Sequence, residues 1–403
     1  MDLSASCASR LRCFMTTEKP ISRASFFKII LLWLPIALWY LAGFSFSHFY
    51  LFFHQVDAFY YHAGNHWLHQ KPLYNGEGNG FVYFPTTAAL LSPLTLLPLK
   101  PFELIYRIIS VSILTLGIYA FATHIGTKNI KQTFFITLLA TMLTSQAAIF
   151  VGQLHIMTTG LMLLAYTKIA REQYWGAAIL LALSLALKPT SIILFLLALG
   201  IFPKLSLRLL LITVIVFGLS FILQSPDYVL SQYASFANSF HVAMHHDADN
   251  PQQWATFFGM LAFYTHWHID GTPQFITRII FAGIVFALCW IAKRRFTIHD
   301  AIYFIVALGM CYLMLFNSRT ESNDYIMVTP LVGYSLALAY QQKNRIAIYG
   351  LSTVILFIAA SWNLSKWLTP HNNIWINPTV ISFYVIYLLK SMYLNSKQLQ
   401  NKK

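Results

Sequence analysis

Long apolar runs, separated by short polar segments, recur along almost the whole chain. Many of them are about 17 to 23 residues long, the length that a helix rising 1.5 Å per residue needs to cross a hydrocarbon layer of roughly 30 Å. Because 57% of the 403 residues are hydrophobic and 10% are charged, the polar side chains are too few to cover a water-soluble protein of this size. A helix satisfies its own backbone hydrogen bonds in lipid, so the sequence predicts an all-α, polytopic integral membrane protein.

The formal net charge of +14 comes from Lys and Arg residues that stand in short clusters between the apolar runs. Such clusters are typical of cytoplasmic loops, so they predict orientation and do not indicate nucleic-acid binding. The clusters are Arg10 to Lys28, Lys128 with Lys131, Lys168 with Arg171, Lys204 with Arg208, Lys293 to Arg295, Lys343 with Arg345, and Lys390 to Lys403. Most acidic residues fall in the alternate loops, which lie on the other side of the membrane from these basic clusters. Both tails, residues 1–27 and 393–403, are therefore expected on the cytoplasmic side of a cell membrane, the inner membrane of a bacterium.

About twelve spans satisfy this alternation within a single transmembrane domain, residues 28–392. They are predicted at residues 28–47, 102–124, 132–150, 154–170, 174–187, 189–203, 206–223, 275–292, 299–316, 325–341, 345–361 and 375–392. The sequence contains no internal repeat that would divide this domain.

Two predicted outer loops are long, residues 48–101 and 224–274. The first contains the apolar segment 81–99, which is interrupted by three prolines and would break the alternation as a full span. We therefore expect a re-entrant or interfacial segment there. The second contains an aromatic segment, residues 254–267, that we expect to lie along the membrane interface.

Asp57 follows the first predicted span, within the stretch HQVDAFYYHAGNHWLHQKPLYN. If this stretch is a juxtamembrane helix, Asp57, Tyr60, Tyr61 and Gly64 share one face at three- and four-residue spacing. A carboxylate among aromatic rings near the lipid headgroups suits a base that faces a sugar. A helix N-cap or a solvated loop carboxylate is the alternative interpretation.

Histidine and cysteine side chains are the candidate metal ligands of this sequence. The histidines stand near Asp57 and in the second outer loop: His54, His62, His66, His69, His241, His245 and His246. No HExxH-type pattern accompanies them, and interfacial histidines more often expose their polar tips to the headgroups. We therefore expect no metal. His245 and His246 beside Asp247 and Asp249 leave a cation site as the alternative. The cysteines, Cys7, Cys13, Cys289 and Cys311, form no CxxC pair and predict neither a disulfide framework nor a zinc site.

A single lysine interrupts the apolar run WGAAILLALSLALKPTSIILFLLALGIF. Lys188 precedes Pro189 at a predicted outer turn, on the side of the membrane where basic residues are not favoured. Pairing with an anion such as a lipid phosphate would explain its position. A lysine that ends a helix and extends to the interface would explain it equally well.

The stretch NSRTESNDYIMVTP forms another predicted outer turn, with Arg319 and Glu321 between apolar spans and Asp324 and Tyr325 beside them. Arg can bind phosphate through two hydrogen bonds, and Glu or Asp can accept hydrogen bonds from sugar hydroxyls. An Arg–Glu salt bridge that merely holds the loop together is the alternative.

A third outer turn carries Gln153 and His155, and Gln153 could bind a sugar hydroxyl or cap a helix. Once topology is assigned from the basic clusters, the candidates fall on one face of the membrane: Asp57, Tyr83 to Pro85, Gln153, Lys188, Arg319 and Glu321. A carboxylate base, two cations and an aromatic surface are the groups that transfer of a sugar from a lipid phosphate to a hydroxyl would need.

Four stretches, taken in order, resemble glycosyltransferase family 87, membrane enzymes of the GT-C class that use polyprenyl-phosphate-linked mannose. They are DAFYYHAGNHWLHQKPLYN, VYFPTTAALLSPLTLLP, the pair GQLHIMTTGLMLLA and GAAILLALSLALKPT, and NSRTESNDYIMVTP. Together they extend from residue 57 to residue 330, and the order and spacing of Asp, KPLY, YFP, GQ and KP carry the resemblance.

The resemblance implies a GT-C-like fold, an essential aspartate in the first outer loop, here Asp57, and a polyprenyl-phosphate mannose donor. It also implies inversion at the anomeric carbon without an obligatory metal or other cofactor. The chain departs from the family in having YFP where Tyr-Pro-Pro is frequent, and in having Thr and Asn near SRTESNDY where some members carry Trp or His. These departures leave the donor sugar and the acceptor open.

The sequence therefore predicts a hexosyltransferase that uses a polyprenyl-phosphate sugar and acts on a lipid, glycan or protein hydroxyl at the non-cytoplasmic face. Asp57 is the expected general base, and Lys188 and Arg319 are expected to bind the donor phosphate. The substrate-binding candidates are Tyr60, Tyr61, Tyr83, Gln153, His155, Glu321 and Tyr325. A transporter or flippase of lipid-linked saccharides would also have a dozen spans, but its charges are expected at the bilayer midplane or on inverted repeats. A GT-C-like scaffold without activity is a third alternative.

Overall fold

The computed structural model describes residues 28–38, 56–74, 80–125, 129–249, 254–368 and 375–400. The chain divides into two compact units, Met1–Phe52 and Phe53–Lys403. In the first unit the described residues form the apolar helix Lys28–Leu38, and the rest of the predicted first span lies outside the described residues. His54, Cys7 and Cys13 also lie outside them.

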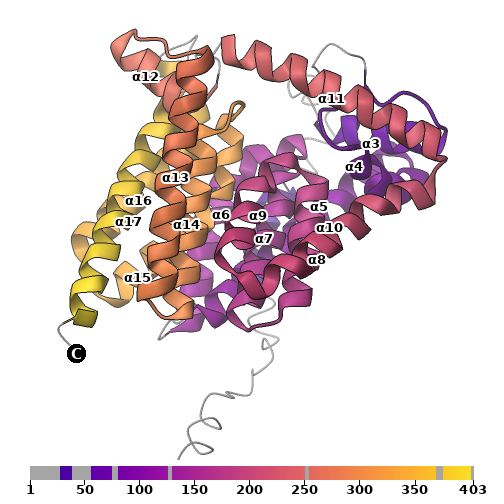
Figure 1. Ribbon diagram of the computed structural model, residues 1–403. Helices are drawn as coiled ribbons and strands as arrows, with labels where there is room; N and C mark the ends of the chain where they lie inside the picture. Colours follow the sequence, from indigo (N-terminus) through magenta and orange to yellow (C-terminus); the bar gives the residue numbers. More distant parts are fainter. Residues whose placement is uncertain are drawn as a thin grey trace, which may run out of the picture. The chain divides into compact units, whose positions relative to one another are not determined.

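The second unit is built from helices, and its described residues contain no strand (Figure 1). In chain order the elements are α3 (Val56–Leu68), α4 (Pro85–Leu91), η2 (Ser92–Leu96), α5 (Leu99–His124), α6 (Ile130–Val151), α7 (His155–Ala170), α8 (Tyr174–Leu187), η3 (Pro189–Ser191), α9 (Ile192–Ile201), α10 (Pro203–Leu223), α11 (Pro226–Asp249), α12 (Phe257–Thr265), α13 (Gly271–Arg295), α14 (Ile298–Phe316), η5 (Ser322–Met327), α15 (Thr329–Gln341), α16 (Arg345–Leu368) and α17 (Ile376–Gln400).

Five of these helices, α5, α6, α10, α13 and α14, are long and apolar enough to cross a membrane. Helix α14 is buried along most of its length, whereas α10 and α13 expose large apolar side chains such as Leu207, Ile222 and Ile279. Such exposed apolar surfaces suit contact with lipid tails. The prediction of an all-helical membrane protein is thus confirmed, and the number of about twelve spans stays a prediction.

Glycines let α5 and α7 cross with their backbones in contact. A Cβ atom on Gly117 would lie 2.6 Å from the carbonyl oxygen of Gly160, and a Cβ atom on Gly160 would lie 2.5 Å from that of Ile113. Helices in lipid gain little from hydrophobic burial against one another, so close approach through small residues strengthens their packing. This crossing fixes the start of α7, which carries part of the site described below.

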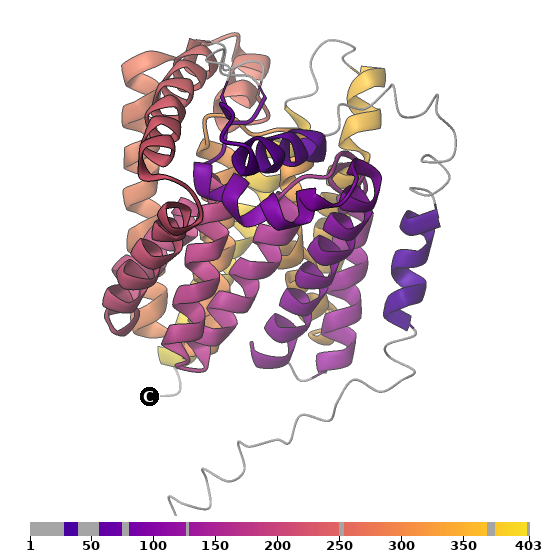
Figure 2. The same cartoon turned by 90° about the vertical axis from the view of Figure 1, so that its right-hand side faces the viewer.

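The first long loop forms short helices that lie across the ends of the bundle. Figure 2 shows α3 lying across the upright helices, and the segment 81–99 is divided between the seven-residue α4 and the 3₁₀ turn η2. Pro85 begins α4 because a proline is tolerated in the first turn, and Pro93 stands at the start of η2.

The second long loop contains a helix that the sequence analysis did not anticipate. Helix α11 packs against the first loop, since Oε1 of Gln232 accepts a hydrogen bond from the backbone of Leu73 and the Tyr228 hydroxyl donates to the carbonyl of Lys71. The expected aromatic segment 254–267 contains the short helix α12. The two long loops therefore support each other above one end of the bundle.

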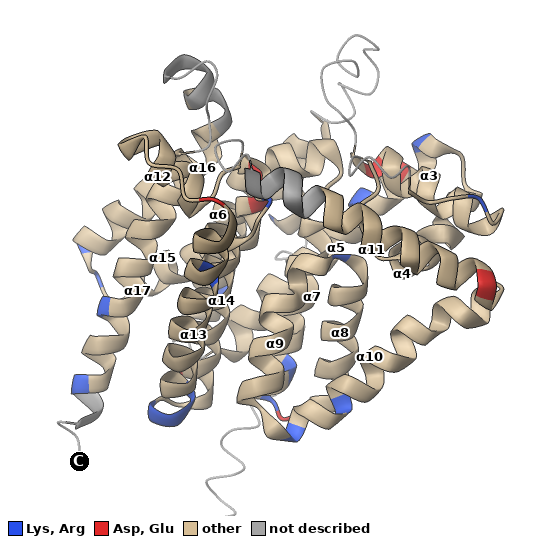
Figure 3. Cartoon of the chain, turned by 45° about the horizontal axis from the view of Figure 1, so that its top comes forward, with Lys and Arg blue, Asp and Glu red and all other residues tan. Residues whose placement is uncertain are grey.

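Basic residues occupy the other end. Figure 3 shows Lys and Arg positions, coloured blue, at the lower ends of α10, α13 and α17, and the last turn of α13 carries Lys293, Arg294 and Arg295. The site described below lies at the other end of the bundle.

Candidate functional site

Asp57 stands in the first turn of α3 and is fully buried, with 0% of its surface exposed. Its Oδ2 accepts a hydrogen bond from Nη1 of Arg107 in α5, and the two groups form an ion pair. Its Oδ1 is buried and has no hydrogen-bond partner among the described residues. One carboxylate oxygen is therefore held in place while the other can accept a proton or a hydrogen bond from a bound molecule.

Burial raises the pKa of Asp57 to about 6, although the positive charge of Arg107 opposes this rise. Helix α3 is not one of the helices with the length and composition of a membrane span. A carboxyl group with this pKa is ionised at neutral pH and is more basic than an exposed aspartate. Both properties suit a general base.

Arg107 is a residue of the site that sequence reasoning missed. Besides its bond to Asp57, it donates through Nε to the carbonyl of Ile149 at 2.9 Å and through Nη2 to that of Phe150 at 2.8 Å. These carbonyls end α6. The carbonyl of Ile149 also accepts from the backbone N–H of Gly152, and Arg107 adds charged donors to both carbonyls. The sequence did contain an indication of this role. Glu103 and Arg107 are ionisable residues four positions apart at the start of an apolar run, and ionisable residues in such a segment are costly unless they have a partner or a function.

Gly152 brings the end of α6 against Asp57. It adopts a left-handed conformation with φ of 73° at the C-cap of α6. A Cβ atom at this position would lie 2.6 Å from Cγ of Asp57, closer than nonbonded carbon atoms approach. Glycine is required here both for the backbone conformation and for the space occupied by the carboxylate.

A line of hydroxyl groups leads from α3 toward Lys188. The hydroxyl of Tyr60, one turn after Asp57, lies 3.0 Å from the hydroxyl of Tyr83. The Tyr83 hydroxyl lies 3.5 Å from Nζ of Lys188, which also stands 5.3 Å from the centre of the Tyr83 ring. Both tyrosine side chains are buried. Residues from α3, from the start of the 81–99 segment and from the end of α8 are thus joined in one polar cluster.

Lys188 is positioned by the break between two helices. Helix α8 ends at Leu187, Lys188 is extended, and Pro189 begins the turn η3. The hydroxyl of Thr87 in α4 donates to the carbonyl of Ala186 at 2.7 Å, which fastens this break to the first long loop. The Lys188 side chain is 6% exposed, so its ammonium is largely removed from water.

His155, the first residue of α7, connects Lys188 to Asp324. Its Nδ1 lies 2.8 Å from Oδ1 of Asp324 and 3.1 Å from Nζ of Lys188. One ring nitrogen cannot donate to a carboxylate and accept from an ammonium at the same time. The contact with Lys188 has hydrogen-bond geometry, whereas the contact with Asp324 is a close electrostatic one. Lys188 thus has the His155 ring nitrogen at 3.1 Å and the Tyr83 hydroxyl at 3.5 Å as acceptors, and the third N–H group of its ammonium can bind an anion.

Asp324 was not among the predicted site residues, although it lies between two of them in the sequence. It is 5% exposed, and its Oδ2 accepts a hydrogen bond from the backbone of Glu321. Burial raises its pKa, but His155 and the charge of Lys188 outweigh this effect and lower the pKa of Asp324 below its ordinary value. Asp324 is therefore a carboxylate that orients His155.

The remaining candidates of this turn are placed differently. Arg319 is half-buried and lies over the Trp254 ring at 4.8 Å, whereas Glu321 is exposed and is acted on by the charges of both Lys188 and Arg319. The charged groups of Lys188, Arg319 and Glu321 therefore lie close enough to influence one another. The hydroxyl of Tyr325 instead donates to the carbonyl of Ala255 inside the protein, so it holds the turn and does not face the polar cluster.

Gln153 follows Gly152 at the turn between α6 and α7 and is 5% exposed. Its Oε1 is buried without a hydrogen-bond partner among the described residues, as is Oδ1 of Asp57 beside it. Unpaired buried acceptors are costly, and a hydroxyl-bearing ligand would satisfy them. Tyr61 does not join this cluster, because its ring packs edge-on against Phe102.

The histidines near Asp57 make local backbone contacts. Nδ1 of His66 donates to the carbonyl of Pro72, and Nδ1 of His69 donates to that of Asn65, each at 2.8 Å. In the part of the chain that the structure describes, no three His, Cys, Asp or Glu side chains are grouped as a metal site. The side chains of His245, His246, Asp247 and Asp249 lie outside this description.

The arrangement combines a carboxylate with one unpaired oxygen, a buried ammonium with spare donor capacity and several unpaired acceptors. These groups come from α3, the 81–99 segment, the α6–α7 turn, the end of α8 and η5. Such a set can take a proton from a hydroxyl and stabilise negative charge on a departing group.

Comparison with known proteins agrees with this chemistry. The family model described as glycosyltransferase family 87 matches residues 81–318, more than half of the chain. The matched segment contains Tyr83, Arg107, His155 and Lys188, and Asp57 precedes it. No curated protein and no solved structure matches the chain. The extent of the family match and the apolar helices together show that the chain belongs to glycosyltransferase family 87 and is a membrane glycosyltransferase.

Proposed function

We propose that the protein transfers a hexose, with mannose as the first candidate, from a polyprenyl-phosphate carrier to an acceptor hydroxyl. The observation that carries this proposal is the buried line from Asp57 through Tyr60 and Tyr83 to Lys188. This line has a carboxylate at one end and an ammonium at the other. Transfer between a hydroxyl acceptor and a phosphate leaving group needs these two groups on opposite sides of the reacting carbon.

In the proposed reaction, Oδ1 of Asp57 takes the proton of the acceptor hydroxyl as the acceptor oxygen attacks the anomeric carbon. The bond between that carbon and the phosphate oxygen breaks, and its electron pair leaves with the polyprenyl phosphate. Attack from the face opposite the phosphate inverts the anomeric carbon. Lys188 and Arg319 are assigned to the negative charge of the departing phosphate, so the proposal needs no cofactor.

Sugar contacts are assigned to the polar groups around this line. Tyr60, Tyr83 and Gln153 offer hydroxyl and amide groups, and His155 is held by Asp324 beside Lys188. Glu321 can accept hydrogen bonds from sugar hydroxyls at the exposed side. The family supports the reaction class, while the donor sugar and the lipid, glycan or protein acceptor are part of the proposal.

The membrane orientation in the proposal follows from the basic residues. Figure 3 shows Lys and Arg gathered at the lower ends of α10, α13 and α17, and such residues favour the cytoplasmic side. The site then faces the outside of a bacterial inner membrane, and both tails are cytoplasmic. The exposed Glu321→Cys and Lys397→Cys variants test this in intact cells: an impermeant thiol reagent should label the first and not the second. The reverse pattern would contradict the orientation.

The activity test uses purified protein in liposomes with radiolabelled polyprenyl-phosphate mannose. Sugar transfer or hydrolysis supports the enzyme, and movement of the intact lipid across the bilayer without chemistry supports a flippase. Asp57→Asn should lower transfer by about 10²-fold or more, because it removes the base and keeps the size of the side chain. Asp227→Asn, at an exposed position in the first turn of α11, is the matched control and should keep full activity.

A further inference from the structure

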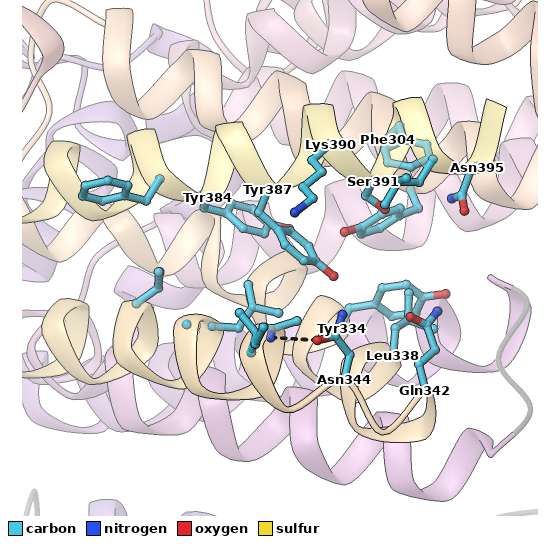
Figure 4. Close-up of a pocket in the computed structure, with 18 of the residues that line it drawn as sticks. Phe304, Tyr334, Leu338, Gln342, Asn344, Tyr384, Tyr387, Lys390, Ser391 and Asn395 are labelled. Carbon is cyan, nitrogen blue, oxygen red and sulfur yellow. Dashed lines mark hydrogen bonds between the residues drawn. The ribbon is translucent and has the colours of Figure 1, made fainter. Parts of the chain in front are cut away.

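A second cavity lies at the opposite ends of the helices from the site. It has a volume of about 720 Å³ and is enclosed by α14, α15, α16 and α17 (Figure 4). Asp300 lines it from the first turn of α14, whereas the turn that carries Arg319 and Glu321 follows the other end of that helix. Since α14 has 19 residues, its two ends lie roughly 28 Å apart. None of the site residues lines this cavity.

The residues that line the cavity differ in how much of their surface is exposed. Tyr334, Leu351 and Tyr384 form a buried inner wall, with 3%, 2% and 1% of their surfaces exposed. Ile346 and Phe383 line the cavity at its rim and are 87% and 63% exposed. The cavity therefore opens sideways between α16 and α17, on a surface that suits lipid tails. Its size falls within the roughly 300 to 1,000 Å³ of ordinary ligand sites.

The lining of the cavity carries one group of each charge. Among the described residues that line it, Lys390 and Asp300 are the charged ones. Oδ2 of Asp300 accepts a hydrogen bond from the Thr297 hydroxyl, whereas Lys390 has no hydrogen-bond partner among the described residues. Figure 4 shows Lys390 and Tyr387 extending from α17 toward the end of α15. A cation and an anion in the lining of an otherwise largely apolar and aromatic cavity match a ligand with both charges and an apolar tail.

We propose that this cavity binds one phospholipid with a zwitterionic headgroup that ends in a primary ammonium. Its phosphate contacts Lys390 and Tyr387, its ammonium contacts Asp300, and one acyl chain lies between α16 and α17. A headgroup without a cation would leave Asp300 facing a negatively charged lipid, and a quaternary ammonium cannot donate a hydrogen bond to Asp300. The proposal does not depend on the glycosyltransferase reaction, because it concerns other residues at the other end of the bundle.

The test is binding of single lipids to purified, delipidated protein. The protein is incubated in mixed micelles with phosphatidylethanolamine, phosphatidylglycerol or phosphatidylcholine, and the bound lipid is measured by native mass spectrometry. Phosphatidylethanolamine should bind about tenfold more tightly than either of the others, since a hydrogen bond to a charged group contributes at least this much. Equal or tighter binding of phosphatidylglycerol, phosphatidylcholine or a polyprenyl phosphate would overturn the assignment.

Two variants locate the binding in this cavity. Lys390→Gln should weaken phosphatidylethanolamine binding about tenfold, whereas Lys397→Gln, on the same helix outside the cavity, should not change it. Gly350 lines the cavity, and a Cβ atom there would meet nothing within 4 Å. Gly350→Phe should therefore fill the cavity and abolish lipid binding while the protein stays folded.

Gly283→Phe is the control for the second variant. Gly283 lies in α13 outside the cavity, and a Cβ atom there also meets nothing within 4 Å. This variant should bind lipid as the unmodified protein does. Full lipid binding by Gly350→Phe, with an unchanged thermal unfolding temperature, would show that the lipid sits elsewhere and would reject the proposal.

Discussion

Arg107 and Asp57, fifty residues apart in the chain, form a buried ion pair that joins α5 to α3. The same guanidinium donates to the last carbonyls of α6. One side chain therefore fixes the proposed base relative to two helices. The position of Asp57 is determined by this contact and by the space that Gly152 leaves for it.

Replacement of Arg107 should destabilise the protein. In Arg107→Gln, Asp57 loses its counter-charge and the α6 carbonyls lose charged donors, so the free energy of unfolding should fall by about 3 kcal/mol. Denaturant unfolding in detergent measures this change. Arg294→Gln, at an exposed position in the last turn of α13, should change stability little. Equal stability of the two variants would mean that the buried pair contributes nothing.

The rate of sugar transfer should depend on pH through Asp57. The group must be a carboxylate to accept a proton, and burial raises its pKa to about 6. The rate should therefore fall about tenfold for each pH unit below the pKa and level off above it. In Arg107→Gln, loss of the positive charge should move the midpoint to higher pH. A rate that stays constant across pH 6, measured with the unmodified protein, would argue against Asp57 as the base.

Substitution of Gly152 should affect activity more than folding. In Gly152→Ala, the new methyl group collides with the Asp57 carboxylate, and the left-handed conformation adds a cost of about 1 kcal/mol. Transfer should fall at least tenfold, because a small displacement of a catalytic group has large effects on rate. Gly283→Ala, in a helix with open space around it, is the control and should keep full activity. Unchanged transfer by Gly152→Ala would show that the close approach is unimportant.

Lys188 should act on the donor. Lys188→Gln keeps a polar side chain but loses the ammonium, so the KM for the polyprenyl-phosphate sugar should rise about tenfold or more if the group binds phosphate. Steady-state kinetics with varied donor measures this effect. Lys131→Gln, at an exposed position in the first turn of α6, should leave the KM unchanged. A normal KM in the Lys188 variant would assign the lysine to packing alone.

Much of the helical architecture could be predicted from the sequence. The predicted spans 102–124, 174–187 and 299–316 coincide with α5, α8 and α14 to within a few residues, because apolar length and helix-ending residues such as Pro189 are local properties. Helix α11 was missed because its sequence mixes polar and aromatic residues, and its position depends on contacts with Leu73 and Lys71 in the first loop.

The candidate site was predicted in part. Asp57, Tyr60, Tyr83, His155 and Lys188 lie in the polar cluster, although they were selected for separate local reasons. The arrangement of the other candidates could not be predicted, because sequence spacing on one helix does not determine which neighbour a side chain meets. The hydroxyl of Tyr325 is bound to backbone, and the ring of Tyr61 packs on Phe102.

The sequence by itself determined the solvent in which the chain folds and the helical form that it takes there, since both follow from apolar length and composition. Only the tertiary structure decided that Arg107 holds Asp57 and that Asp324 orients His155. The members of each pair are far apart in the chain, so no local propensity brings them together. Whether the members of a pair meet depends on how the helices cross. Burying a charge without a partner is costly, so the helices must pack in an arrangement that pairs all of these charges at once.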